Sequence, residues 1–266
     1  CALPIYPGST ERLLTNAQLE FQRDHFLPWR IEYLAQIRGA MLAESTKGEE
    51  EARQISETLE TVENGLKVFK GQRGALVEPS FFAVKAGEEK KLRDALAARA
   101  DLRGKYGDPF QDIASIVVMQ KQAYLPYQML EVRYGAGSVL LNDARTLVRA
   151  ASERSKPDDD RLPEFMNSRL PGQKGALLAE APVHPVLERL EIVFWLEKTR
   201  EYLGADHPAV KALFGSRTSG EIAADIIMSS QVGDAGFRRR MWDNPQLVMQ
   251  SNDPALVLVK RADDAA

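Results

Sequence analysis

The longest regular pattern of hydrophobic residues lies in the first third of the chain. Its members alternate steps of three and four residues, at Ala52, Ile55, Leu59, Val62, Leu66 and Phe69. That spacing places one stripe on a single face of an α-helix and differs from the two-residue alternation of a strand. Acidic residues at 49–51 precede the stripe and Lys67, Lys70 and Arg73 lie near its end, which suits the helix dipole. The pattern predicts a helix from residue 49 to about residue 73.

A second long helix is predicted just before it, over residues 16–45. Thr15 or Asn16 can cap the first turn of this helix. Pro28 removes one backbone donor inside the segment and therefore predicts a kink. A short polar segment then separates the two helices, so we expect them to form an antiparallel hairpin.

Elsewhere the chain alternates between helical segments and short turns, without a repeat of fixed period. The first ten residues predict a short apolar strand that ends in a Pro-Gly turn. The polar segment 156–172, with three prolines and an acidic run, is the best candidate for a linker. Further helices are predicted over residues 88–107, 109–132, 139–155, 184–204, 207–215, 219–230, 235–243 and 253–262. The expected fold is all-α: an irregular multi-helix domain with a long N-terminal antiparallel helix hairpin and a short leading strand.

Composition narrows the class of protein. The chain has 266 residues, 44% hydrophobic and 27% charged, which fits one large domain or two small ones. A net charge of −3 gives no electrostatic reason to expect nucleic acid or an anionic membrane as a partner. Arg238, Arg239 and Arg240 form a short run that predicts a solvated helix face. The single cysteine, Cys1, excludes an internal disulfide framework. No apolar run reaches the roughly 18 residues of a membrane span.

A search for chemistry finds no complete catalytic group. His25, His184 and His207 lack the spacing of a helical metal site, and the last two precede proline, where capping a helix is the ordinary role. The acidic run 158–160 lacks the glycine and distal glutamate of a calcium loop. The segment 134–138 resembles a phosphate loop only superficially and predicts a turn. No serine lies in a nucleophile elbow. No cofactor and no metal are expected.

The helix over 49–73 carries glycines where they are costly. Gly65, Gly71 and Gly74 each cost about 1 kcal/mol relative to alanine in a helix interior. They indicate a close approach of another backbone, a kink, or a surface that something must touch. Asn64 lies about 170° from the centre of the apolar stripe, Gly71 shares its face, and Lys67 lies nearby. From the pattern alone, a polar residue in that position is usually just solvated.

Several segments, taken in order, resemble the helical insert of the bacterial dipeptidyl-peptidase 7/11 family. They are residues 6–34, 63–76, 143–162, 199–210 and 251–266. Members of this family are serine exopeptidases with a chymotrypsin-like double β-barrel and a large helical domain that caps the active-site cleft. The family's catalytic His and Asp precede this region, and its nucleophile follows it in a Gly-Asn-Ser-Gly-Ser context. That motif does not occur in this sequence.

The resemblance implies a domain organisation. Residues 1–10 would be a residual strand and turn from the catalytic barrel, and residues 11–266 the helical cap domain, with a possible sub-boundary at 156–172. Cys1 would be a cut end, and this chain alone would be inactive. The implied location is periplasmic or secreted. The alternatives are a free-standing helical scaffold or protein-interaction domain, and an inactive homologue that keeps the cap.

The resemblance also implies a site. In the family, an asparagine on this helix helps to hold the free α-amino group of the substrate, and Asn64 matches it. Gly65, Lys67 and Gly71 would then face the cleft. The implied partners are peptide substrates with a free N-terminus and the missing barrel of the parent chain. Whether the parent prefers acidic or hydrophobic residues at the second substrate position would depend mainly on the pocket of that barrel.

Overall fold

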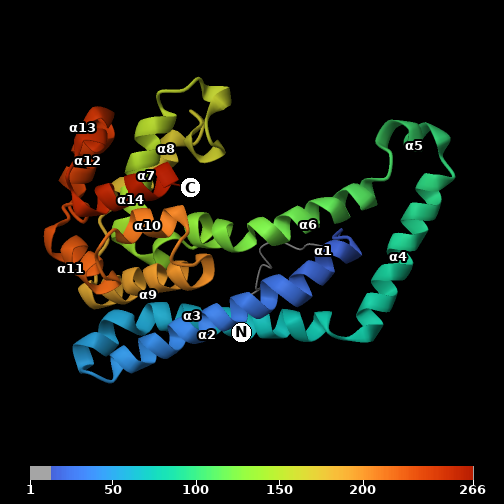
Figure 1. The fold of residues 1–266 in the computed structure, drawn as a ribbon, viewed down its shortest axis with the longest axis horizontal. Coiled ribbons are helices and arrows are strands. Elements are labelled where there is room, and N and C mark those ends of the chain that lie inside the picture. The colour runs from blue at the N-terminus through green and yellow to red at the C-terminus, as the bar shows by residue number, and fades with distance from the viewer. Residues whose placement is uncertain (1–12, 266) are drawn as a thin grey trace, which may run out of the picture. The chain divides into compact units, whose positions relative to one another are not determined.

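The computed structural model describes residues 13–265, and every element in this range is a helix (Figure 1). The predicted strand and turn at 1–10 lie outside the described residues. The first elements are α1 (Asn16–Phe21), a π turn (Gln22–Phe26), α2 (Leu27–Ser45), α3 (Glu49–Leu76), α4 (Pro79–Ala97), α5 (Ala100–Tyr106) and α6 (Pro109–Tyr127). A π turn (Gln128–Val132) and a 3-10 turn (Tyr134–Gly137) follow. The all-α prediction is confirmed.

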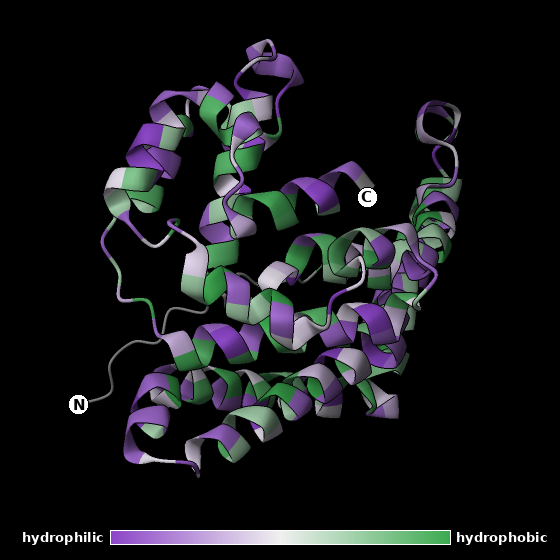
Figure 2. Ribbon diagram, turned by 60° about the vertical axis from the view of Figure 1, so that its left-hand side comes forward, coloured by the Kyte–Doolittle hydropathy of each residue, from purple (hydrophilic) through white to green (hydrophobic). Residues whose placement is uncertain are grey.

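The remaining helices are shorter on average. They are α7 (Val139–Glu153), α8 (Leu170–Leu178), α9 (Pro185–Leu203), α10 (Pro208–Phe214), α11 (Ser219–Ser229), α12 (Ala235–Asp243), α13 (Pro245–Gln250) and α14 (Pro254–Ala265). Two 3-10 turns, Asp158–Asp160 and Pro163–Phe165, lie between α7 and α8. Hydrophobic and hydrophilic residues alternate around individual helices, as expected for amphipathic elements (Figure 2).

The chain divides into two compact units. Residues up to 39 and residues 58–124 form the first unit, and residues 40–57 and those from 125 onward form the second. The segment 156–172 lies within the second unit, where Phe165 is buried and the Leu162 amide donates to Glu153 at 2.7 Å. The sub-boundary expected there stays a prediction about the organisation of the whole protein.

The second unit has a continuous hydrophobic core. Helix α9 packs against α11, and α7 packs against α13 and α14. Trp195 of α9 is fully buried, its Nε1 donates to the carbonyl oxygen of Met129 at 2.8 Å, and its ring centroid lies 4.4 Å from that of Tyr134. The buried residues around it come from every helix from α7 to α14. This core holds helices α7 to α14 of the second unit together.

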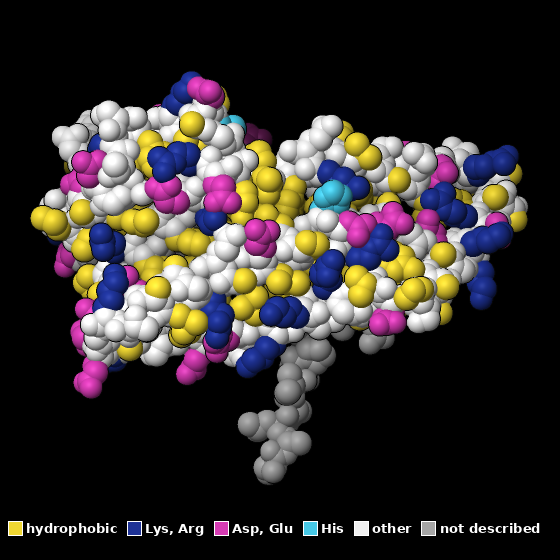
Figure 3. Space-filling model, turned by 60° about the horizontal axis from the view of Figure 1, so that its bottom comes forward, with side chains coloured by type: hydrophobic (Ala, Val, Ile, Leu, Met, Phe, Trp, Pro, Cys, Tyr) yellow, Lys and Arg dark blue, Asp and Glu magenta, His cyan; other side chains and the backbone are white. Residues whose placement is uncertain are grey.

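The first unit has a much smaller core. One buried cluster consists of Leu19, Leu27 and Leu76, and partly buried residues such as Phe26 and Phe69 pack against it. Other buried hydrophobic residues of this unit are Phe21, Tyr33, Leu34, Ile37, Val62, Leu66, Val117 and Tyr124. Helices α4 and α5 contain no fully buried residue. On the face of the molecule that Figure 3 shows, hydrophobic side chains lie between charged ones. Local caps and polar contacts must therefore hold this unit together to a larger extent.

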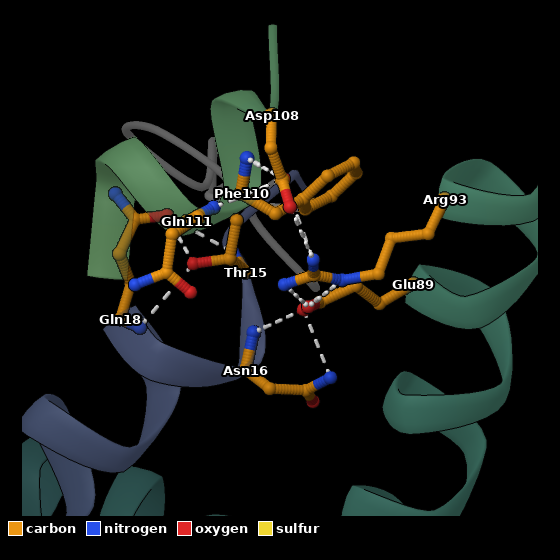
Figure 4. A network of polar contacts seen from close by, with 8 residues as sticks. All are labelled: Thr15, Asn16, Gln18, Glu89, Arg93, Asp108, Phe110 and Gln111. Carbon is orange, nitrogen blue, oxygen red and sulfur yellow. Dashed lines mark hydrogen bonds and ion pairs between the residues drawn. The ribbon is translucent and has the colours of Figure 1, made fainter. Parts of the chain in front are cut away.

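A polar network joins the start of α1 to α4 in the first unit (Figure 4). The Asn16 amide and its side-chain Nδ2 both donate to one oxygen of Glu89, at 2.7 and 2.9 Å. Arg93, one turn further along α4, forms an ion pair with Glu89 at 3.0 Å. Thr15 caps α1 in a capping box with Gln18, which confirms one of the two predicted caps.

The same network reaches the start of α6. Arg93 also pairs with Asp108 at 3.4 Å, and its guanidinium lies 4.6 Å from the ring centroid of Phe110. Asp108 accepts hydrogen bonds from the amides of Phe110 and Gln111 and thereby caps α6 (Figure 4). The carboxylates of Glu89 and Asp108 and the guanidinium of Arg93 thus connect the starts of α1 and α6 to α4.

Helices α2 and α3 contact each other within the first unit. A Cβ added at Gly65 would lie 3.2 Å from Cδ1 of Leu34, and Arg38 Nε donates to Glu63 at 2.8 Å. Both contacts favour the predicted hairpin. Its complete arrangement stays a prediction, because both helices extend into the second unit.

The structure corrects three details of the predicted helices. The segment predicted as one helix over 88–107 begins at Pro79, which suits the first turn of α4, and it breaks at Ala98 and Arg99. The irregularity expected at Pro28 is a π turn just before it, where the Leu27 amide donates to the Gln22 carbonyl five residues back.

The third correction concerns the arginine run in α12. The sequence predicted a solvated side chain at Arg238, but this side chain is buried, with 3% of its surface exposed. Its guanidinium donates to the carbonyl oxygens of Leu177, Ala179, Val232 and Gly233 at 2.6–2.9 Å. These carbonyls belong to the ends of helices and loops, so the arginine supplies hydrogen bonds that the local backbone lacks.

Candidate functional site

Asn64 lies on the exposed face of α3, opposite the stripe that packs inward. Val62 and Leu66 on either side of it along the chain are buried, whereas Asn64 is exposed. No other described residue hydrogen-bonds its side-chain amide, so both the carbonyl oxygen and the amide nitrogen are available. The orientation predicted from the helical pattern is confirmed. Its role in binding is a separate matter.

The residues expected beside Asn64 divide into two kinds. Lys67 and Gly71 are exposed on the same side of α3. A Cβ added at Gly71 would meet no atom within 4 Å, and the same holds for Gly74. Gly65 is half-buried instead, and its missing side chain leaves room for Leu34 of α2. The close approach of Leu34 therefore explains why position 65 is a glycine. No neighbouring atom among the described residues explains the glycines at positions 71 and 74.

Helix α3 shows no break at any of these glycines. It runs from Glu49 to Leu76 as one helix. The kink offered by the sequence as an explanation for Gly65, Gly71 and Gly74 is therefore absent. The exposed part of this helix presents an uncharged amide at Asn64, a cation at Lys67 and bare backbone at Gly71 and Gly74.

A second polar group, which sequence reasoning missed, is buried in the second unit. Glu188 of α9 accepts hydrogen bonds from Ser138 Oγ at 2.5 Å and from the amides of Val139 and Leu140 at 2.8 and 3.4 Å. It therefore caps the start of α7 from another helix. Burial raises the pKa of Glu188 above its ordinary value, and these three donors act against the shift.

Glu191, one turn further along α9, lies in a less favourable place. It is 3% exposed, and no described residue donates a hydrogen bond to its carboxyl group. Burial and then repulsion by Glu188 raise its pKa to about 8. A Cβ on Gly137 would lie 2.6 Å from one of its oxygens, and Gly137 has a φ of 134°. The glycine is thus required both by its backbone conformation and by the carboxyl group beside it.

Asp143 and Arg238 complete this buried polar region. The Arg238 Nε lies 3.4 Å from an Asp143 oxygen. Burial raises the pKa of Asp143 to about 6, although Arg238 acts in the opposite direction. Only a spacing of three residues between Glu188 and Glu191, on a helix that also carries Ile192 and Trp195, could have indicated two inward-facing acids. Apart from the Ser138 hydroxyl and the Asp143–Arg238 pair, these side chains bind backbone groups, so we interpret this region as structural.

None of the three histidines is arranged for catalysis. His207 accepts a hydrogen bond from the Ala209 amide at 3.2 Å, so its predicted capping role is confirmed. His184 stands at the cap position of α9 without a side-chain hydrogen bond to the helix, so the predicted cap is wrong there. His25 is exposed and stacks on Phe21. Among the described residues, no group of three His, Cys, Asp or Glu side chains is placed to hold a metal ion.

A hydrophobic groove of about 680 Å³ lies in the second unit between the end of α2, α9 and α11. Val193, Phe194 and Ile227 are among its lining residues. Two of its acids already have partners, because Glu44 pairs with Lys47 and Glu197 accepts from Ser219. The groove brings together no acid, base and nucleophile, and so gives no catalytic chemistry.

Comparison with known proteins gives one clear finding. A family model described as peptidase S46 matches residues 5–266. A search of curated proteins found no significant match. Within residues 13–265, no helix is long and apolar enough to cross a bilayer.

Proposed function

Because the chain belongs to the peptidase S46 family, the dipeptidyl-peptidase 7/11 family, we propose that residues 11–266 form the helical cap of a serine dipeptidyl-peptidase. Membership implies a hydrolase that acts on peptides. The cap would cover the active-site cleft and help to bind the free N-terminus of the substrate, in a periplasmic or secreted enzyme. The observation that carries this proposal is the exposed side chain of Asn64 on α3, which forms no hydrogen bond with another described residue.

The chemistry of Asn64 suits a free amino group. An α-ammonium group that leaves water needs hydrogen-bond acceptors, and an amide carbonyl oxygen is one that adds no second charge. Since no described residue engages the Asn64 side chain, it needs no rearrangement to accept such a bond. An exopeptidase that removes two residues has to bind the N-terminus at a fixed distance from its nucleophile. An acceptor on a rigid helix is suited to set that distance.

The bond-breaking groups would come from the barrel of the whole enzyme. There a serine activated by histidine would attack the peptide carbonyl, and an oxyanion hole would stabilise the developing charge. The three histidines are consistent with this division, since none of them hydrogen-bonds a serine within residues 13–265. The cap would supply binding and access, and Lys67 and Gly71 would accompany Asn64 along the cleft, whereas Gly65 faces Leu34 of α2.

The test is the Asn64→Ala variant of the full-length protein. Hydrogen bonds to charged groups contribute about 1.5–3 kcal/mol, so kcat/KM on dipeptide substrates should fall roughly 10- to 150-fold. The melting temperature should not fall, because Asn64 is exposed and alanine favours a helix. Gln72→Ala, an exposed amide on the same helix, is the matched control and should leave kcat/KM unchanged.

Unchanged kinetics with a raised melting temperature would show that Asn64 is merely a solvated residue. That result would favour a helical scaffold or interaction domain without a catalytic role. A second measurement concerns the chain by itself. Residues 1–266 should show no turnover of fluorogenic dipeptides and no stoichiometric labelling by a serine-directed probe.

A further inference from the structure

A row of cations follows Asn64 along α3. Lys67, Lys70 and Arg73 are all exposed, and none forms an ion pair with another described residue. At Lys67, the lack of an ion pair has an identifiable cause. Glu63 stands one turn before it, at the spacing that usually gives a helical ion pair, but Glu63 pairs with Arg38 at 2.7 Å instead. Lys67 therefore keeps its charge without a neighbour that neutralises it.

The three cations point in different directions. At about 100° per residue, Lys67 lies roughly 60° around the helix from Asn64, Lys70 roughly 120° in the same sense, and Arg73 roughly 180°. Lys67 is thus the cation that shares the face of Asn64. Gly71, on the same face one turn further, adds no side chain that would stand between Lys67 and a bound molecule.

We propose that Lys67 determines specificity by favouring substrates whose first residue is acidic. This inference rests on the proposed function, in which Asn64 holds the substrate's amino group. Side chains three residues apart on a helix have Cβ atoms about 5–6 Å apart. The side chain of the first substrate residue branches from the carbon that carries the amine. An aspartate or glutamate there can reach the Lys67 ammonium, whereas a lysine or arginine is repelled.

The pairing acts mainly on binding. No bond forms or breaks at the first side chain, so a charge pair there is present equally in the bound substrate and in the transition state. It should lower KM for acid-first substrates more than it raises kcat. Because the pair is partly open to water, added salt should weaken the preference.

The experiment uses the full-length enzyme and dipeptide substrates that differ only in their first residue, which is aspartate, asparagine or lysine. In Lys67→Gln, the ratio of kcat/KM for aspartate-first to lysine-first substrates should fall about 10-fold, since attraction and repulsion are lost together. Lys67→Arg keeps the cation and should retain the ratio. Lys70→Gln removes the same charge from the neighbouring face and should change the ratio less than about 2-fold.

The outcomes separate this inference from the proposed function. If Asn64→Ala lowers kcat/KM for all three substrates but Lys67→Gln leaves the ratio unchanged, the specificity role is overturned and the cap function stands. If Lys67→Gln and Lys70→Gln change the ratio equally, the effect is general electrostatics and the inference is overturned. If Lys67→Gln alone changes it while Asn64→Ala has no effect, Lys67 is supported and the role of Asn64 fails. A full-length protein that releases no dipeptide overturns both.

Discussion

In the second unit, α7, α9, α11 and α14 surround a core in which Trp195, Ile192 and Leu196 are completely buried. In the first unit, α4 and α5 bury no residue fully, and Leu92 of α4 and Met119 of α6 are 60% and 61% exposed. Since hydrophobic burial is the main source of stability, the two units should open at different free energies. The proposed binding face belongs to the less densely packed unit.

Under the proposed function, the densely packed unit would supply stability and the other unit the binding face. The second unit even tolerates a buried acid, Glu191, that lacks a hydrogen-bond donor among the described residues. The first unit depends on polar contacts such as those of Glu89 with Asn16 and Arg93. A helix face that must stay accessible, such as that of Asn64, cannot also be covered by a core.

The largest expected effect compares Trp195→Ala with Leu76→Ala. Removing the buried tryptophan should cost about 3–5 kcal/mol of opening free energy in α7, and it also leaves the Met129 carbonyl without its donor. Leu76 lies in the small cluster of the first unit. Replacing it with alanine should lower the opening free energy measured in α4 by about 2 kcal/mol or less, because water can fill the space left by the side chain. Native-state hydrogen exchange measures both. Equal costs would remove the distinction between the units.

A pH series on Glu191→Gln sharpens the account of the second unit. Because the folded-state pKa of Glu191 is about 8, above its ordinary value near 4.3 in an unfolded chain, ionisation opposes folding. Its unfavourable contribution grows as the pH rises from about 4 to 8. The variant should therefore be more stable than the wild type by roughly 2–4 kcal/mol at pH 8.5 and about equal at pH 4.

The control for that series is Glu201→Gln, an exposed glutamate on the same helix with Lys198 as its partner. It should show no gain at pH 8.5. Urea unfolding followed by circular dichroism gives both free energies. A Glu191→Gln variant that loses stability at pH 8.5 would mean that the ionised carboxylate is stabilised after all.

The smallest expected effect compares two glycines of α3. Gly71→Ala should stabilise the helix by about 0.5–1 kcal/mol, because nothing lies within 4 Å of the added Cβ. Gly65→Ala should gain less or lose stability, because Leu34 must move. In the full-length enzyme, Gly71→Ala should also lower kcat/KM if this face lines the cleft. A more stable variant with full activity would show that Gly71 stays clear of the substrate.

The sequence predicted the local features that follow from spacing and capping. The stripe of α3, the capping box at Thr15 and the proline starts of α10 and α14 are all signalled by neighbouring residues. The position of Asn64 opposite the stripe followed from helical geometry. The match of the peptidase S46 family model confirms the predicted family, and the assignment to its helical cap stays a prediction.

What could not be predicted depends on distant partners. The burial of Arg238 and Glu191 arises from loops and helices far along the chain, and a charged residue in a helix ordinarily faces water. The break at Ala98 and Arg99 has no glycine or proline to mark it. The three glycines of α3 looked alike in the sequence, and only the contact of Gly65 with Leu34 distinguishes it from Gly71 and Gly74.

The most direct test of the central claim asks whether Asn64 recognises the amino group itself. Inhibition constants of a product dipeptide and of its desamino analogue are compared in the wild type and in Asn64→Ala of the full-length protein. The account predicts that the wild type favours the free amine and that the variant loses at least 10-fold of this preference, while the analogue binds both proteins alike. An equal loss for both ligands, or no loss for either, would contradict it.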